Sequence, residues 1–207
     1  SIRDRVGTIV LDSGSHSFGF GQYSVLVTDP IKEIISFGDT QEVRTDEGIK
    51  FFNGNPFDLL RNELSFGPEF ENRLEQVPFC GGAVGYFSYD FGRRLKPTTL
   101  KAQSDRNMPD YRFGIYDSAL VWDHSSKVLY ASADLSSQDP EWSIKRLRKL
   151  VDRATDSERI RSFDVGELVS NFTRDSYLEQ IGKLRELIRE GEIYQANFSH
   201  QFRARFE

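Results

Sequence analysis

The chain contains few of the residues that form disulfide bonds or bind metal ions in small folds. It contains one cysteine, Cys80, one methionine and three histidines in 207 residues. A single cysteine excludes an intramolecular disulfide and a cysteine metal cluster, and the scattered histidines do not form a zinc-binding pattern. We therefore predict no metal ligands in this chain, and the cytoplasm as the simplest compartment.

Long hydrophobic runs and an excess of positive charge are also missing. No apolar run is long enough to span a bilayer, and the N-terminus has no charged-then-apolar signal segment. The chain has 27 Lys and Arg against 32 Asp and Glu, a formal net charge of −5. We therefore expect neither a membrane nor a nucleic acid as the main partner.

What the chain does have is aromatic and aliphatic side chains in quantity. Hydrophobic residues make up 38% of the sequence, and 17 residues are Phe, which is enough for an aromatic-rich core. The length suits one large domain, or one and a half small ones.

The most regular pattern lies at the C-terminal end, in residues 192–206. Apolar or aromatic residues and His200 alternate with polar residues: the first set is Tyr194, Ala196, Phe198, His200, Phe202, Ala204 and Phe206, and the second is Gln195, Asn197, Ser199, Gln201, Arg203 and Arg205. A period of two over this length predicts a long strand with one buried face. The polar face is either a solvated sheet surface or a surface that binds oxygen-rich, anionic groups.

The segment before this strand predicts a helix. Thr173 is a good N-cap, and Gly191 supplies the C-terminal stop. The inner face recurs at helical spacing as Tyr177, Ile181, Leu184 and Ile188. Because the chain ends just after the predicted strand, we expect these 207 residues to be the front part of a longer protein.

The rest of the chain alternates short strands with two further helices. We predict strands over 6–11, 23–27, 31–37, 42–52, 81–87, 115–123 and 127–133. Helices begin at Asn55–Pro56 and Asp139–Pro140, the second with Arg146 on its solvated side. Residues 155–171 are the best linker candidate. The glycine-rich loop 18–22 either wraps a flat ligand or is an ordinary loop, and Arg93–Arg94 is either an anion site or a surface pair.

Spacing alone predicts no catalytic constellation. We find no activated Ser or Cys nucleophile motif, no phosphate-binding loop and no dinucleotide fingerprint.

Several segments resemble chorismate-utilising enzymes. EGEIYQANFSHQF (Glu190–Phe202) resembles their glycine-acid-x-Tyr-Gln-x-Asn-x-Ser-x-x-Phe segment. GGAVGYFSYDFGRR (Gly81–Arg94) and the stretch Met108–His124 are similar to the aminodeoxychorismate synthase component I family, the para-aminobenzoate branch. The pattern of the same family is also matched by Asp12–Gly14, Tyr23 and Asp29–Pro30. The anthranilate synthase component I family shares the last motif but matches the middle segments less well.

The resemblance implies an α+β protein with an anthranilate synthase component I-like fold. Large antiparallel sheets would pack face to face with helices outside, and the fold would be incomplete in this chain. Residues 1–165 would form the N-terminal component I domain, and 166–207 the start of a truncated chorismate-binding domain.

The resemblance also implies a reaction. Members of the family replace the chorismate 4-hydroxyl by an amino group, with ammonia from a glutamine amidotransferase partner and Mg²⁺ on the substrate carboxylate. Their nucleophilic lysine, their metal ligands and their acid/base glutamate lie in the second half. We therefore predict no catalytic residue here, and an inert chain when it stands alone.

One binding site carries over from the family, as an effector-type pocket for tryptophan. It comprises Ser13, Phe20, Gly21, Gln22 and Tyr23. Gln22 replaces a basic residue and Gly21 a hydroxyl residue, so a vestigial or empty pocket is the alternative. Two further alternatives remain for the whole chain: the anthranilate branch, and a stand-alone tryptophan-binding regulatory module.

Overall fold

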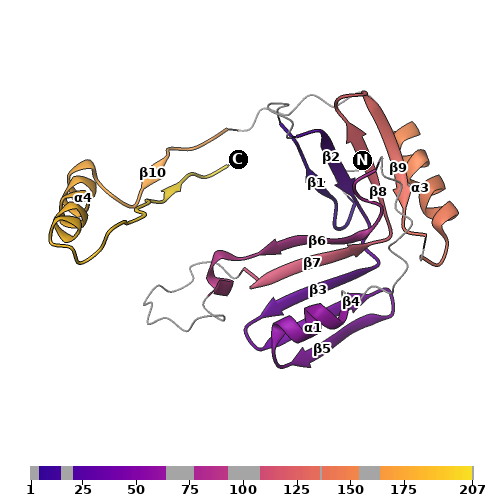
Figure 1. Ribbon diagram of the computed structural model, residues 1–207, viewed down its shortest axis with the longest axis horizontal. Coiled ribbons are helices and arrows are strands. Elements are labelled where there is room, and N and C mark those ends of the chain that lie inside the picture. The colour runs from indigo at the N-terminus through magenta and orange to yellow at the C-terminus, as the bar shows by residue number, and fades with distance from the viewer. Residues whose placement is uncertain are drawn as a thin grey trace. The chain divides into compact units, whose positions relative to one another are not determined.

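The computed structural model describes residues 5–14, 21–63, 77–92, 108–135, 137–153 and 164–206. The chain divides into two compact units, Ser1–Thr155 and Asp156–Glu207, and each is described by itself (Figure 1). Within the described residues, no helix is both long enough and apolar enough to cross a membrane. The sequence-based domain division at 165 and 166 stays a prediction about the complete protein.

The first unit contains a four-stranded antiparallel sheet. Its strands are β1 (Ile9–Leu11), β2 (Tyr23–Val27), β8 (Ser118–Asp123) and β9 (Val128–Ala133), in the order β1-β2-β8-β9. The predicted hairpin between β8 and β9 is confirmed, and Lys127 closes its turn with a φ of 57°.

A five-stranded antiparallel sheet forms the rest of this unit. It consists of β3 (Lys32–Phe37), β4 (Thr40–Thr45), β5 (Gly48–Asn53), β6 (Gly82–Phe87) and β7 (Tyr111–Tyr116), in the order β5-β4-β3-β7-β6. The single strand predicted over 42–52 is wrong, because β4 and β5 form a hairpin in which Thr45 pairs with Gly48. Gly48 has a φ of 133°, which side-chain-bearing residues rarely adopt.

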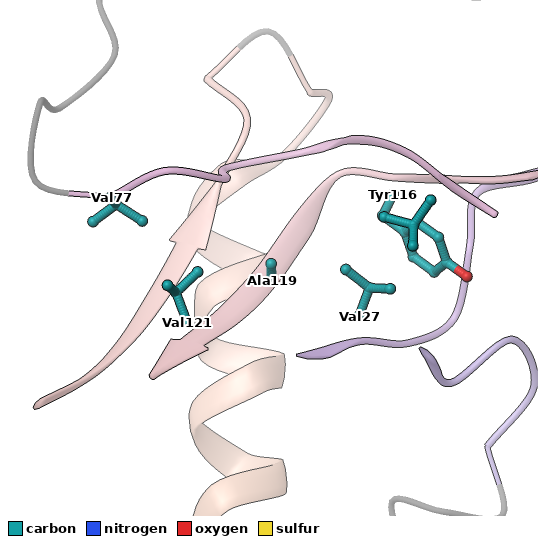
Figure 2. Close-up of a cluster of buried hydrophobic side chains, with 6 residues drawn as sticks. Val27, Val77, Tyr116, Ala119 and Val121 are labelled. Atoms are coloured by element: carbon teal, nitrogen blue, oxygen red, sulfur yellow. The ribbon is translucent and has the colours of Figure 1, made fainter. Parts of the chain in front are cut away.

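The two sheets pack face to face around one hydrophobic cluster, as predicted. Val27, Ala119 and Val121 come from the first sheet, and Val84 and Tyr116 from the second. Figure 2 shows most of these side chains gathered together with Val77. Burial of a side chain of this size stabilises a fold by about 1.5–3 kcal/mol.

The strand pair β6–β7 depends on glycines for close approach. A Cβ on Gly85 would lie 2.0 Å from the carbonyl oxygen of Arg112, and one on Gly114 would lie 2.6 Å from the Tyr116 hydroxyl oxygen. The tightly packed strand predicted over 81–87 is therefore confirmed. Its burial is limited to the first half, since Phe87 is 50% exposed.

Two helices cover the sheets from outside (Figure 1). The helix α1 (Pro56–Glu63) packs Leu60 against Ile34 and Tyr111 of the five-stranded sheet. The helix α3 (Pro140–Asp152) lies along β8 and β9 and buries Leu147. The N-cap prediction at Asp139 is confirmed, because its carboxylate accepts a 2.8 Å hydrogen bond from the Trp142 N–H. A short 3-10 helix, η3 (Tyr89–Phe91), follows β6.

The chain passes between the two sheets at two dipeptides that begin with aspartate, Asp117–Ser118 and Asp29–Pro30. The strand predicted over 115–123 is split at Asp117, where β7 ends and β8 begins in the other sheet. A second crossing lies between β2 and β3, where Asp29 has a φ of 53°. The predicted strand 23–27 ends before Asp29, whereas the strand predicted over 115–123 ran through the polar pair Asp117–Ser118.

Arg146 joins these two crossings to α3, so its prediction as a solvated residue is wrong. Its guanidinium donates to Asp29 Oδ2 at 2.6 Å and lies 3.6 Å from Asp117 Oδ1, and its side chain is only 14% exposed. Ser143 donates to Asp117 from the same helix at 2.7 Å. Both carboxylates are partly buried, where a nearby cation stabilises their charge, and Asp29 also pairs with Arg5 at 2.8 Å.

The second unit contains β10 (Val169–Ser170), α4 (Arg174–Arg189) and β11 (Phe202–Arg203). The helix prediction is confirmed at both ends: the Thr173 hydroxyl accepts from the Ser176 N–H at 3.2 Å, and Gly191 has a φ of 79°.

The long strand predicted over 192–206 is wrong in this structure. Only Phe202–Arg203 forms a strand, paired with β10, and Phe206 makes an isolated bridge to Val165. The predicted apolar side is largely exposed, with Tyr194 at 94%. An alternating sequence becomes a strand only where another strand pairs with its backbone, and β10 supplies two residues.

Candidate functional site

The predicted effector residues meet where β2 begins beside the β8–β9 hairpin. Tyr23, the first residue of β2, pairs with Asp123, the last residue of β8. Ser13 follows β1, the strand on the other side of β2. The structure thus brings Ser13, Gln22 and Tyr23 together, with Gly21 next in the chain. Phe20 lies outside the described residues.

Hydrogen bonds of Ser13 hold the segment after β1 against β2. Its hydroxyl donates to the Tyr23 carbonyl at 2.7 Å, and its backbone N–H donates to Ser24 Oγ at 3.0 Å. Because the single hydroxyl hydrogen is used within the protein, Ser13 Oγ presents only lone pairs to a ligand. It therefore suits a donor such as an ammonium group.

Gln22 bridges the two strands at this end of the sheet. Its amide nitrogen donates to the Tyr23 hydroxyl at 3.0 Å and to Asp123 Oδ1 at 3.5 Å. The backbone carbonyl of Gln22 accepts a hydrogen bond from the backbone N–H of His124 at 2.9 Å. Gln22 thus links the two strands through hydrogen bonds, and as a neutral side chain it brings no positive charge to a ligand carboxylate.

Asp123 supplies a negative charge beside Gln22. The Ser126 hydroxyl donates to Oδ2 at 2.8 Å, and this bond holds the pKa of Asp123 below its usual value. The Ser125 N–H adds a further bond to Oδ1 at 2.9 Å. The carboxylate is therefore ionised at neutral pH.

Ser24 and His124, which the sequence did not single out, form a second polar group with Asp12 at the same end of the sheet. Ser24 Oγ donates to Asp12 Oδ1 at 3.0 Å and lies 2.7 Å from His124 Nε2. Ser24 Oγ therefore links the Asp12 carboxylate to the His124 ring through adjacent hydrogen bonds. The sequence predicted the hairpin that carries His124, but strand register alone places it against Ser24.

The combined site offers carboxylates, hydroxyls, an amide and an imidazole. Asp12, Asp123 and Ser13 Oγ accept hydrogen bonds, which suits a positively charged ligand group. A ligand carboxylate would meet Gln22 rather than a cation. The site's chemistry therefore favours the amine end of an amino acid over its acid end.

Other predicted features are spread apart or lie elsewhere. Arg93 and Arg94 lie outside the described residues. Among the polar residues that alternate along 192–206, Arg203 Nε donates to Gln201 Oε1 at 2.8 Å, and both side chains belong to the second unit. Among the residues that the structure describes, no group of three or more His, Cys, Asp or Glu side chains could hold a metal ion.

Comparison with known proteins gives the family context. Residues 10–207 match the profile of the chorismate binding enzymes. The aminodeoxychorismate synthase component 1 of Escherichia coli (strain K12) is 28% identical over 198 residues, covering 96% of this chain and 42% of that protein. Anthranilate synthase alpha subunit 2, chloroplastic, of Arabidopsis thaliana is 29% identical over 224 residues, covering 94% of this chain and 35% of that protein.

A solved structure confirms the predicted fold class. The crystal structure of anthranilate synthase component I from Streptococcus pneumoniae TIGR4 matches with a TM-score of 0.64 at 21% identity. The match covers 86% of this chain and 40% of that chain. The chain therefore spans about two fifths of the length of the proteins it matches.

Proposed function

Because the chain belongs to the chorismate binding enzyme family, we propose that it is the N-terminal part of an aminodeoxychorismate synthase component I. The observation that carries this proposal is the similarity to the Escherichia coli aminodeoxychorismate synthase component 1 over 96% of the chain. Proteins of the same name from Salmonella typhimurium and Bacillus subtilis are similar over 96% and 86% of it.

In this proposal the complete protein aminates chorismate to 4-amino-4-deoxychorismate. The C–N bond to ammonia forms, the C–O bond to the 4-hydroxyl breaks, and the hydroxyl leaves as water. Ammonia comes from a glutamine amidotransferase subunit, and the product enters para-aminobenzoate and folate biosynthesis in the cytoplasm.

Mg²⁺, when bound, would neutralise the substrate carboxylate and polarise the leaving hydroxyl. The described residues offer no cluster that fits such an ion, so no residue of this chain is assigned to it. No catalytic residue is assigned to the chain either. Its own contribution is the packed pair of sheets and the polar site at the start of β2.

The site at Ser13, Phe20, Gly21, Gln22 and Tyr23 would take tryptophan or a similar amine as an effector. Support comes from the lone pairs of Ser13 Oγ and from the nearby carboxylates of Asp12 and Asp123, which suit an ammonium group. Gln22 leaves the ligand carboxylate without a charged partner, so we expect weak binding.

A second candidate is the N-terminal part of an anthranilate synthase component I. The specific observation in its favour is the 29% identity to the Arabidopsis thaliana alpha subunit 2, equal to the identity to the Salmonella typhimurium aminodeoxychorismate synthase component 1. The two candidates share the substrate and differ in the product.

The test is the product that is made from chorismate. The protein translated from the whole reading frame that contains these codons, supplied with ammonia and Mg²⁺, should form aminodeoxychorismate. Anthranilate as the product would establish the second candidate. Absence of turnover together with micromolar tryptophan binding would instead favour a stand-alone regulatory module.

The 207-residue chain alone should not aminate chorismate under the same conditions. Formation of aminodeoxychorismate above the enzyme-free rate would show that catalytic groups lie within this chain.

A further inference from the structure

The strand β5 lies at the edge of the five-stranded sheet and carries an apolar surface. It pairs with β4 on one side, and no strand of the described residues pairs with it on the other (Figure 1). All six of its residues are exposed, including Ile49 at 53%, Phe51 at 66% and Phe52 at 39%. Lys50 is its only charged residue. Soluble proteins usually shield such an edge with charges, bulges or proline, so an edge as apolar as this one points to a partner.

The backbone of β5 directs alternate hydrogen-bonding groups away from the sheet. The Gly54 N–H donates to the Asp39 carbonyl at 3.2 Å, so the backbone of Gly54 faces the β4 side. Because this direction alternates along an antiparallel strand, the odd-numbered residues Ile49, Phe51 and Asn53 direct their N–H and C=O groups toward the open edge. The two-residue turn that joins β4 to β5 gives the same alternation, since the residues that close such a turn bond to each other.

These outward groups match those of a second copy of the same strand. Two β5 strands related by a two-fold axis through Phe51 run antiparallel, with Phe51 opposite Phe51 and Ile49 opposite Asn53. Every pair joins residues whose backbone groups point outward, so each outward N–H and C=O finds a partner. The ends of the strand leave room for this approach, since a Cβ on Gly48 or Gly54 would have no described heavy atom within 4 Å.

The side chains select this register over its neighbours. An axis through Lys50 would place two ammonium groups opposite each other, which is unfavourable. An axis through Phe52 would leave Ile49 opposite residue 55, which lies beyond the strand. The axis through Phe51 instead places two phenyl rings opposite each other and sets Lys50 against Phe52 of the second copy. Both are favourable cross-strand pairs.

We propose that two copies of this chain associate through β5, so that their five-stranded sheets join into one continuous antiparallel sheet. The contact is a single pair of strands, so we expect weak association, with a dissociation constant on the order of 0.1 mM. At about 1 µM the chain is then monomeric, and unfolding measured at that concentration reports on the single chain. This association is separate from chorismate chemistry and does not depend on the proposed function.

Cysteine cross-linking tests the register. With the axis through Phe51, the two Cα atoms of residue 51 lie about 5.5 Å apart, within the range that a disulfide spans. At concentrations near the expected dissociation constant, Phe51→Cys should form a disulfide-linked dimer on oxidation, with the link located at residue 51 by peptide mapping. The parent chain, which contains Cys80 alone, is the background control.

Ile49→Cys is the matched variant, because it lies on the same edge and Ile49 is 53% exposed. Its counterpart in the second copy lies roughly 13 Å away along the strand, so it should cross-link roughly 10-fold less than Phe51→Cys. Mixed with Asn53→Cys, it should form the link between residues 49 and 53. Equal cross-linking of Ile49→Cys alone and Phe51→Cys would overturn the proposal, since random collision would explain both.

Sedimentation equilibrium tests the association itself. Phe51→Asp places two carboxylates opposite each other at the axis and should weaken association by roughly 10-fold or more. Tyr89→Asp adds the same charge in η3, on a side chain that is 99% exposed, and should leave association unchanged. A parent chain that remains monomeric at about 1 mM would overturn the proposal. Association of Phe51→Asp as strong as that of the parent would overturn it as well, because the contact would then lie elsewhere.

The protein translated from the whole reading frame undergoes the same cross-linking. A disulfide between two copies of its Phe51→Cys variant supports the same pairing in the complete protein. Cross-linking confined to the 207-residue chain would overturn the proposal for the complete protein, because other residues would then cover β5. Turnover of chorismate is not a readout of these experiments, so failure of the pairing and failure of the proposed function remain distinguishable.

Discussion

Val84 illustrates what a single side chain contributes between the two sheets. It is 6% exposed and packs in the cluster with Val27 and Tyr116. Val84→Asp places a carboxylate in this apolar cluster, so we expect a loss of about 3 kcal/mol or more in the free energy of unfolding. Urea unfolding measures the loss.

The matched control for Val84 is Phe51→Asp, which adds the same charge on a side chain that is 66% exposed. We expect this variant to remain within about 0.5 kcal/mol of the parent. Equal stability of the Val84→Asp variant and the parent would contradict the packing of the sheets.

Two buried tyrosines make stability sensitive to alkaline pH. Burial raises the pKa of Tyr111 and of Tyr116 to about 12. In the unfolded chain each phenol ionises near pH ~10, so the folded state favours the neutral form. Stability from these groups is complete below pH ~10 and is lost as the pH rises toward about 12. Unfolding midpoints across this range should fall accordingly.

Phenylalanine variants separate this effect from general alkaline unfolding. Tyr111→Phe should flatten the alkaline decline, because it removes one buried ionisable group. Tyr89→Phe should leave the decline unchanged, since Tyr89 is 99% exposed. A decline of the same steepness in all three proteins would exclude Tyr111 as a source.

At the scale of elements, Arg146 fixes α3 to the points where the chain crosses between sheets. Its guanidinium contacts Asp29 and Asp117, one residue at each crossing. Arg146→Ala removes that cation from both carboxylates, while Asp29 keeps its ion pair with Arg5, so we expect a loss of about 2 kcal/mol in unfolding free energy. Arg148→Ala, on the exposed side of α3, should change stability by less than about 0.5 kcal/mol.

The measurement for this pair is urea unfolding of both variants at neutral pH. If the two variants lose similar stability, α3 is held by its apolar contacts alone, and the ion pairs at the crossings contribute little.

At the scale of the whole molecule, the site at the start of β2 predicts weak amino-acid binding. The amine group of tryptophan would have Asp12, Asp123 and Ser13 Oγ as acceptors, but its carboxylate would have only Gln22 as a partner. An unpaired ligand carboxylate costs a few kcal/mol, so we expect the 207-residue chain to bind tryptophan no better than roughly millimolar. Calorimetric titration measures this constant.

Tryptamine, which lacks the carboxylate, is the matched ligand for this titration. It should bind at least as well as tryptophan. Micromolar tryptophan binding by this chain would show a complete pocket within residues 1–207, and would favour the regulatory module over the synthase.

Features that depend on neighbouring residues could be predicted from the sequence alone. Local hydrogen bonding predicts the helix caps at Thr173 and Asp139 and the hairpin turn at 123–126. A short apolar pattern predicts the strand over 23–27. Motifs in a fixed order along the sequence also indicated the family resemblance, and that resemblance predicted the fold class.

Features that depend on partners distant in sequence became clear only from the folded structure. The predicted strand 115–123 contains the polar pair Asp117–Ser118, but the pattern does not show that the chain changes sheets there, or that Arg146 is partly buried against both crossings. The register between β2 and β8 places His124 against Ser24. The alternation in 192–206 predicted a strand, but strand formation also needs a backbone partner, and β10 pairs with only two of those residues.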